Sequence, residues 1–218
     1  MESSFHKHEL EKHPAKMKSM SEASNTNTET HAFPPFINSH VKALMIGSFP
    51  PARSKWRMEF YYPNFQNDMW RIFGLVFFDD KDYFVTEDGK SFDIVLLKSF
   101  LSEKGIGVAD MGKEVIRQKD NASDKFLEIV QPLNISKLLQ ELPGCNAFIT
   151  TGEKATETLR IHLSDTIRPP KVGERTTFSY LGREFSLYRM PSSSRAYPMR
   201  LEKKAKIYRQ CFRDIGIF

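Results

Sequence analysis

Short apolar segments alternate with segments of helical periodicity along most of the chain, and this alternation limits the fold more than any other feature. Residues 43–47 form a wholly apolar run that ends in Gly-Ser-Phe-Pro-Pro, which is typical of a buried strand followed by a loop. Two further strands are predicted over 105–110 and 146–150. Because alternating strands and helices favour a parallel sheet covered on both faces, we expect a three-layer α/β/α fold with a central, mainly parallel sheet.

Apolar residues at helical spacing predict the helices that connect these strands. The predicted helices span 67–77, 91–104, 135–142, 153–162 and about 200–215. Two extended runs over 176–180 and 184–188, separated by Leu-Gly-Arg, predict a hairpin or a bent pair of strands. Ligands gather at the carboxyl ends of parallel strands. The residues that follow predicted strand ends, and that one crevice could therefore collect, are Ser48, Asp110, Thr151 and Pro191.

The first 39 residues differ in composition from the rest of the chain. They are rich in polar residues, include four of the six histidines, and show almost no periodic apolar pattern before Phe33. Such a composition is typical of a disordered segment. We expect a disordered polar tail over 1–39 and a single domain over 40–218, with order beginning at Val41. The spacing of His6, His8 and His13 could hold a metal weakly, but a solvated arm is the favoured interpretation in a flexible segment, and these histidines are assigned no chemistry.

Positive charge is concentrated in the last quarter of the chain. The formal net charge is +5, and residues 160–218 hold 13 basic and five acidic residues. A positive patch can neutralise phosphates and attract nucleic acid, but it can equally be a solvated helix face. Charge alone therefore leaves both interpretations open.

The sequence shows no sign of a metal site, a cofactor or a membrane span. Cys145 and Cys211 lie 66 positions apart without a CxxC pair, and both are interpreted as small buried hydrophobic residues. No stretch of 18 uncharged apolar residues occurs, and the N-terminus lacks the pattern of a secretory signal. We expect a protein of the bacterial cytoplasm.

The segment after the first strand carries the most specific motif. It reads GSFPPARS over 47–54 and FYYPNFQNDMW over 60–70. These residues resemble the first active-site motif of the uracil-DNA glycosylase superfamily, and most closely its branch of hypoxanthine-DNA (deoxyinosine) and mismatch-specific glycosylases. The resemblance covers roughly residues 42–212 and places Asn67 on the family's catalytic asparagine.

Three later segments resemble further motifs of the same family in the same order. Residues 190–197 (MPSSSRAY) resemble the Pro-Ser-x-Ser loop that wedges into the DNA groove beside a flipped nucleotide. Residues 105–124 resemble a strand that ends in Asp and is followed by Ser-Asp, and residues 152–155 resemble a Gly-x-Lys-Ala helix start. Small hydroxyls and an arginine suit contact with phosphates and with the gap in the base stack. The predicted DNA-binding residues are Pro191, Ser192, Ser193, Ser194, Arg195 and Lys154.

Removing a base requires the nucleotide to leave the duplex and enter a pocket that stacks the base and binds its edge. Aromatic rings are candidates for stacking, although some of them could belong to the core instead. Asp110 either binds the Watson–Crick edge of the base or caps the following turn. The residues assigned to the base pocket are Ser48, Phe49, Tyr62, Phe65 and Asp110.

Asn67 is the strongest catalytic candidate, since its amide could orient a water molecule or hydrogen-bond the departing base. Without the resemblance, an Asn at a helix start would be interpreted as an N-cap. Asp68 is a second catalytic candidate, because it could supply the carboxylate that several branches carry after the first strand and that Ser48 and Phe49 lack here. Neighbouring helical residues point about 100° apart, however, so an exposed Asp68 favoured by the helix dipole is the alternative.

The second motif lacks the histidine that many members of the family use against the uracil carbonyl. Stabilisation of the leaving base would then come from backbone amides or Ser192. The resemblance implies a monofunctional, monomeric DNA glycosylase without cofactor or metal, which acts on double-stranded DNA and removes hypoxanthine, uracil or a mismatched base. A non-catalytic nucleic-acid-binding protein of the same fold is the alternative. An unrelated α/β hydrolase is disfavoured because GxSxG, P-loop and Rossmann motifs are absent.

Overall fold

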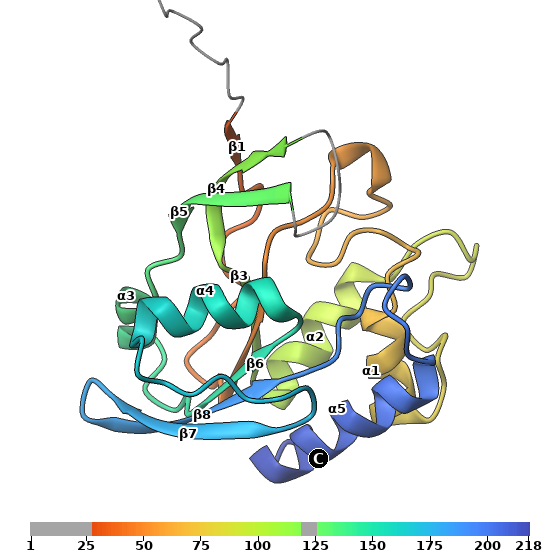
Figure 1. Cartoon of the computed structure of the whole chain (residues 1–218). Coiled ribbons are helices and arrows are strands. Elements are labelled where there is room, and N and C mark those ends of the chain that lie inside the picture. Colours follow the sequence, from red (N-terminus) through yellow and green to blue (C-terminus); the bar gives the residue numbers. More distant parts are fainter. Residues whose placement is uncertain (1–27, 119–125) are drawn as a thin grey trace, which may run out of the picture.

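The computed structural model describes residues 28–118 and 126–218, and its secondary structure alternates between strands and helices (Figure 1). The first elements in chain order are β1 (Thr28–Thr30), β2 (Ala43–Gly47) and the short 3-10 helix η1 (Arg53–Lys55). The remaining elements are α1 (Met69–Phe78), α2 (Ile94–Lys104), β3 (Ile106–Asp110), β4 (Gly112–Arg117), β5 (Leu127–Pro132), α3 (Ile135–Gln140), β6 (Ala147–Thr150), α4 (Glu153–Leu163), β7 (Arg175–Tyr180), β8 (Arg183–Arg189) and α5 (Leu201–Ile215).

A five-stranded sheet in the order β3-β2-β6-β8-β7 forms the centre of the fold. Strands β3, β2, β6 and β8 pair in parallel, and β7 pairs antiparallel with β8 at one edge. Every residue of β2 is buried, as expected for a strand that has a neighbour on each side and helices on both faces. The expected α/β fold with a central sheet is confirmed.

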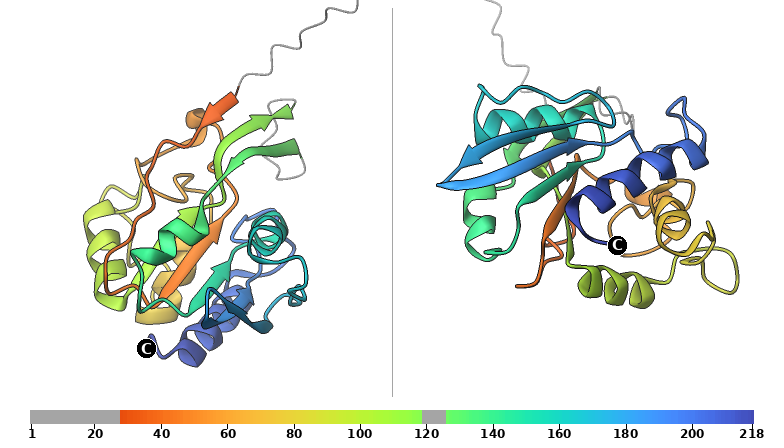
Figure 2. Two further views of the ribbon diagram at one scale, coloured as in Figure 1. Left: turned by 90° about the vertical axis from the view of Figure 1, so that its left-hand side faces the viewer. Right: turned by 90° about the horizontal axis from the view of Figure 1, so that it is seen from below.

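The two faces of β2 belong to two separate hydrophobic clusters. Ala43 and Met45 pack with residues of α1, α2 and α5, whereas Leu44 and Ile46 pack with residues of α3 and α4. Alternate residues of a strand point to opposite faces, so one apolar run supplies both clusters. Figure 2 shows helices on both sides of the sheet.

A second, three-stranded antiparallel sheet in the order β1-β4-β5 was not predicted. Its first strand lies within the segment that composition assigns to a disordered tail, so that boundary was wrong for residues 28–39. Thr28–Thr30 pairs with Glu114–Ile116, and Phe33 and Phe36 pack against the main core. Strand β1 is thus ordered by its pairing with β4, which is distant in the sequence, although its own composition does not predict a strand. The rest of the predicted tail, and the Ser-Asp at 123–124, lie outside the described residues.

Local signals explain where several helices begin and end. Asp93 caps α2 by accepting a hydrogen bond from the Leu96 amide at 3.0 Å, and Gly105 ends that helix in the left-handed conformation at φ 66°. Gly105 thereby turns the chain directly into β3, which delivers Asp110 to the carboxyl end of the sheet. Among the described residues, no helix is both long and apolar enough to cross a membrane.

Candidate active site

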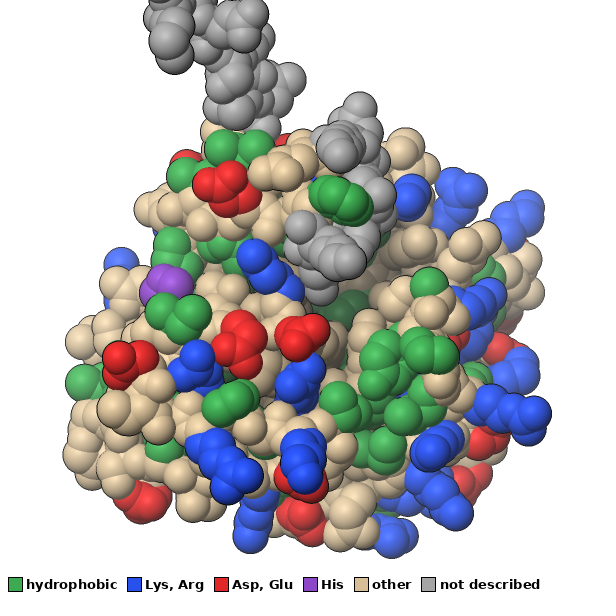
Figure 3. Space-filling view, viewed as in Figure 1, with side chains coloured by type: hydrophobic (Ala, Val, Ile, Leu, Met, Phe, Trp, Pro, Cys, Tyr) green, Lys and Arg blue, Asp and Glu red, His purple; other side chains and the backbone are tan. Residues whose placement is uncertain are grey.

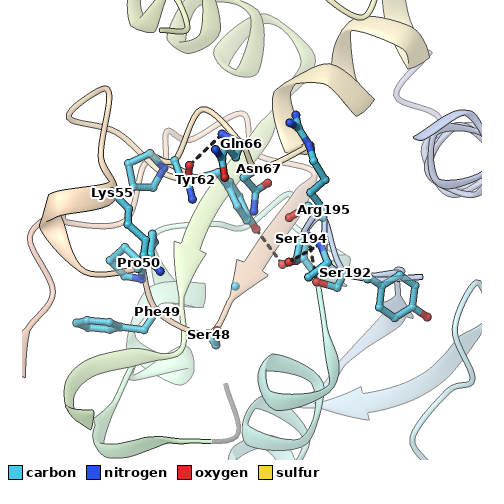
Figure 4. A pocket seen from close by; sticks show the side chains of 18 of the residues that line it. Ser48, Phe49, Pro50, Lys55, Tyr62, Gln66, Asn67, Ser192, Ser194 and Arg195 are labelled. Atoms are coloured by element: carbon cyan, nitrogen blue, oxygen red, sulfur yellow. Dashed lines mark hydrogen bonds between the residues drawn. The ribbon is translucent and has the colours of Figure 1, made fainter. Parts of the chain in front are cut away.

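A cleft of about 680 Å³ opens at the carboxyl ends of β2, β3 and β6. Segments far apart in the sequence meet there (Figure 4). The residues that line it are Gly47, Ser48, Phe49, Pro50, Pro51, Lys55, Tyr62, Pro63, Asn64, Gln66, Asn67, Asp110, Thr151, Ser192, Ser193, Ser194, Arg195, Ala196, Tyr197 and Pro198. The structure therefore brings Ser48, Asn67, Asp110 and Ser192 to one site, as the sequence predicts.

The register of β2 and β3 places Asp110 directly beside Gly47. A Cβ atom on residue 47 would lie 2.2 Å from Oδ1 of Asp110, which is closer than side chains approach. The loops that follow these strands are joined by two backbone hydrogen bonds of 2.9 Å, from Met111 to Gly47 and from Gly112 to Ser48. Glycine at position 47 thus gives the carboxylate its place at the edge of the cleft.

His31 contacts the other oxygen of this carboxylate. Its Nε2 lies 2.9 Å from Oδ2 of Asp110, and the two side chains are only 7% and 8% exposed. The imidazole is surrounded by the rings of Phe33, Phe49 and Tyr61, with ring centroids 5.3–5.9 Å away. Burial, and to a lesser degree the Asp110 carboxylate, raise the pKa of Tyr61 far above its ordinary value, so that its phenol stays neutral.

Asn67 lies half-buried at the start of α1 and lines the cleft. Its Oδ1 accepts a hydrogen bond of 2.9 Å from the Met69 amide. The capping role and the position at the cleft are therefore compatible, since the oxygen holds the helix start and the Nδ2 group remains a donor. Within residues 28–118 and 126–218, no hydrogen bond from Nδ2 is found.

Tyr62 is held in a strained backbone conformation beside Asn67. Its φ of 52° lies in the left-handed region, which costs a non-glycine residue about 1–3 kcal/mol. The phenol hydroxyl is 2.9 Å from Oγ1 of Thr151, and the ring meets the edge of Trp70 at a centroid distance of 5.7 Å. These contacts fix the ring at the cleft. Together with Phe49 it offers two aromatic surfaces there (Figure 4).

Residues 190–197, here called the serine loop, are bound to the start of α1. The Asp68 amide donates to the carbonyl of Ser193 at 2.9 Å, and Nζ of Lys204 donates to the carbonyl of Ser194 at 2.8 Å. Ser193 is buried, while Ser192 is half-buried and Ser194 and Arg195 are exposed. The backbone of the loop is therefore held in place, while its side chains reach the cleft.

Asp68 differs from both sequence interpretations. It is buried rather than exposed, and it is not among the residues that line the cleft. Its Oδ2 accepts from Nζ of Lys204 at 3.0 Å and its Oδ1 lies 3.3 Å from Nε of Arg195. The catalytic assignment of Asp68 was wrong, because both carboxylate oxygens are directed to basic side chains of the serine loop and α5.

Three other predicted site residues lie away from the cleft. Phe65 packs against the ring of Phe92 and beneath the Arg71 guanidinium, which lies 4.4 Å from its ring centroid. Pro191 is buried, and its carbonyl accepts a hydrogen bond from the Tyr208 hydroxyl at 3.0 Å. Lys154 is half-buried near the start of α4 and does not line the cleft. Phe65 therefore belongs to the core rather than to a base pocket.

The sequence analysis missed two residues that hold the site together, His31 and Lys204. No local pattern distinguishes His31 from the other histidines of its polar segment. Lys204 could have been found, because it precedes Tyr208 by four positions and Cys211 by seven, and so lies on the buried stripe of α5. A lysine on such a stripe requires a buried partner.

The described part of the chain holds no group of three or more His, Cys, Asp or Glu side chains that could bind a metal ion. Both cysteines are buried and unpaired with each other. Burial raises the pKa of Cys145 to about 11 and raises that of Cys211 further, so both are protonated thiols near neutral pH. The cleft itself is lined by carboxylate, amide, hydroxyl, aromatic and basic side chains.

No protein-family model and no curated protein matches the chain. Among solved structures, the chain is similar to the solution NMR structure of a "putative Uracil DNA glycosylase from Methanosarcina acetivorans". The TM-score is 0.56 and the sequence identity is 20%, over 86% of this chain and 98% of that chain. At this identity the likeness concerns the fold. The chain thus shares the overall fold of a protein described as a uracil DNA glycosylase.

Proposed function

We propose that this protein is a DNA glycosylase that takes a deaminated or mismatched base, hypoxanthine or uracil, out of duplex DNA and hydrolyses its N-glycosidic bond. The observation that carries the proposal is the convergence of Asn67, Asp110 and the serine loop on one cleft. These residues come from three separated parts of the chain and match three motifs in the family's order. The fold likeness and the packing of helices on both sides of a mainly parallel sheet agree with a three-layer glycosylase fold.

Asp110 suits recognition of a deaminated base. Deamination converts a ring-nitrogen acceptor into an N–H donor, at N1 when adenine becomes hypoxanthine and at N3 when cytosine becomes uracil. An ionised carboxylate accepts hydrogen bonds and donates none, so it would favour the deaminated base over the parent base. Phe49 and Tyr62 would stack on the flipped ring.

Asn67 suits the bond-breaking step. A water oxygen adds to C1′ while the C1′–N bond breaks and the electron pair of that bond stays on the base. The proton that the water loses passes through solvent to the departing base, so the products are the abasic sugar and the neutral base. Positive charge develops on the sugar and negative charge on the base, so fixed dipoles stabilise the transition state. The Nδ2 group of Asn67 would donate to the departing base, or its amide would orient the water. No side-chain amine lining the cleft is needed, and the product would be an abasic site.

Basic side chains beside the cleft suit the phosphate backbone of DNA. Figure 3 shows Lys and Arg side chains along the edge of the molecule on the side of α1 and α5. The exposed basic residues of the cleft, the η1 region and the α5 region are Arg53, Lys55, Arg57, Arg195, Arg200, Lys203, Lys206 and Arg213. A monomer acting on duplex DNA in the cytoplasm, with Lys154 as an outlying phosphate contact, completes the proposal.

Single-turnover cleavage of duplexes that carry uracil, hypoxanthine or a G·T mismatch tests this function. Asn67→Ala should lower the rate by about 10²-fold to 10³-fold, as expected when one donor to a developing negative charge is lost. Asn134→Ala is the matched control, because Asn134 caps α3 through a 3.0 Å hydrogen bond from the Lys137 amide and lies outside the cleft.

Equal rates for Asn67→Ala and the control would contradict the catalytic role of Asn67. Tight binding of the lesion duplexes without cleavage of any of them would favour the non-catalytic nucleic-acid-binding protein instead.

A further inference from the structure

His31 reaches the edge of the cleft because β1 adds a strand to the second sheet. Its backbone amide donates to the carbonyl of Lys113 in β4 at 2.8 Å, directly after the last residue of β1. The ring then points to Asp110 at the end of β3, with Nε2 2.9 Å from Oδ2. A segment more than 70 residues away in sequence thus supplies the partner of the cleft carboxylate.

The surroundings of the ring accommodate both of its protonation states without movement. Nε2 donates to Asp110 in either state. Nδ1 lies 3.0 Å from the Phe33 amide and 2.8 Å from the Phe33 carbonyl. In the neutral ring Nδ1 can accept a hydrogen bond from that amide, and in the protonated ring it can donate one to that carbonyl. The pair of His31 and Asp110 therefore has net charge −1 or 0, depending on one proton.

Among the residues that the structure describes, few other charged groups lie near this proton. Asp110 is the ionisable group that hydrogen-bonds the ring, and Tyr61, which faces the ring from the loop after η1, is neutral. On the side of β4, Arg117 lies 5.8 Å from the Phe49 ring centroid and is paired with Glu29 of β1 at 2.8 Å. That arginine charge is thus compensated locally, and Asp110 is the acidic group in direct contact with the histidine.

Building on the proposed glycosylase function, we propose that His31 is a positioning residue that cancels the charge of Asp110 while the base departs. The base leaves with the electron pair of the C1′–N bond, and a bare carboxylate beside it would repel that charge. A protonated His31 removes the repulsion, keeps its proton throughout, and holds Oδ2 so that Oδ1 stays over Gly47 at the cleft. Excision should therefore need Asp110 ionised and His31 protonated.

The pH dependence of single-turnover excision tests this role. The wild-type rate should rise as Asp110 ionises and fall again as the pH rises through the titration of His31, which gives a bell-shaped profile. His31→Gln keeps a donor for Asp110 but cannot become charged, so it should lose the alkaline limb. Its rate at the wild-type optimum should fall about 10- to 100-fold, the range found when outer-shell partners of metal ligands are removed. Lesion binding should change far less.

His162→Gln is the matched control, because His162 is exposed on α4 and hydrogen-bonds the Thr158 carbonyl. It should keep the wild-type profile. A second variant, His31→Ala, leaves a space that added imidazole can fill. Imidazole should restore activity, whereas pyrazole, a ring of similar shape that stays neutral, should not.

The possible results separate this inference from the proposed function. Wild-type cleavage with an unchanged pH profile in His31→Gln, or equal rescue by pyrazole and imidazole, would overturn the role of His31 and leave the glycosylase function intact. Absence of cleavage by the wild-type protein would overturn both. Loss of the alkaline limb together with selective rescue by imidazole would support the role of His31.

Discussion

Asp110 and Asp68 are both nearly buried carboxylates, with side chains 8% and 9% exposed, yet their partners leave different atoms available. Asp110 is bound through Oδ2 by a histidine, and its Oδ1 remains beside Gly47 at the cleft. Asp68 is bound through both oxygens, by Lys204 and Arg195. One carboxylate keeps an oxygen at the cleft, while the other fastens the serine loop and α5 to the start of α1.

The basic side chains that bind these two carboxylates also differ. Lys204 is completely buried and hydrogen-bonds both Asp68 and the Ser194 carbonyl, which suits a permanent structural contact. His31 has two ring nitrogens, one on Asp110 and one beside the Phe33 backbone, which suits a site where charge changes during a reaction. The two ion pairs are thus similar in burial but differ in the direction of the carboxylate and in the type of basic side chain.

Of the two pairs, Asp68–Lys204 should cost more free energy of unfolding when it is broken. Lys204→Met leaves Asp68 with less compensation in a buried setting and should lower the free energy of unfolding by about 3–5 kcal/mol. Chemical denaturation measures it, with Lys203→Met, an exposed neighbour on α5, as the control. Adding Asp68→Asn to Lys204→Met should recover part of the loss. Equal stability of the two lysine variants would show that the pair does not fasten the loop.

The cleft carboxylate should respond to its glycine neighbour. Gly47→Ala would place a Cβ atom 2.2 Å from Oδ1 of Asp110 and 3.4 Å from the hydroxyl of Tyr62. We expect a loss of about 1–3 kcal/mol in the free energy of unfolding, since overpacking displaces side chains, together with loss of excision.

Gly144→Ala is the control for this variant, because its nearest contact would be an ordinary 3.6 Å to the Val41 carbonyl. Full excision by Gly47→Ala would mean that the position of Asp110 does not matter.

The smallest effect on stability is expected at Arg195. Its side chain is 57% exposed and lies 3.3 Å from Asp68, so Arg195→Ala should change the free energy of unfolding by less than about 1 kcal/mol. If Arg195 contacts a phosphate, DNA binding should weaken for all sequences and the salt slope should fall by about one. A binding titration at several salt concentrations measures this. An unchanged slope would place Arg195 away from the DNA backbone.

Local sequence patterns predicted most of the main sheet and its helices. The apolar run at 43–47, the strand ending at Asp110 and the amphipathic α5 each carry their periodicity within a few residues. Ser48, Asp110 and Thr151 were predicted to share a crevice because strand ends of a parallel sheet meet at one edge, and the family resemblance added Asn67 and Ser192. Local chemistry and simple topology suffice for these features.

Only the tertiary structure decided which residues hold the cleft together. Strand β1 forms because a partner strand more than 80 residues away completes its hydrogen bonds, and composition contains no trace of such a partner. The same holds for His31, and for the direction of the Asp68 carboxylate, which depends on a lysine 136 positions later. The sequence determined the elements and the candidate groups, whereas contacts between distant segments determined that Asp68 is bound through both oxygens and that Asp110 keeps Oδ1 at the cleft.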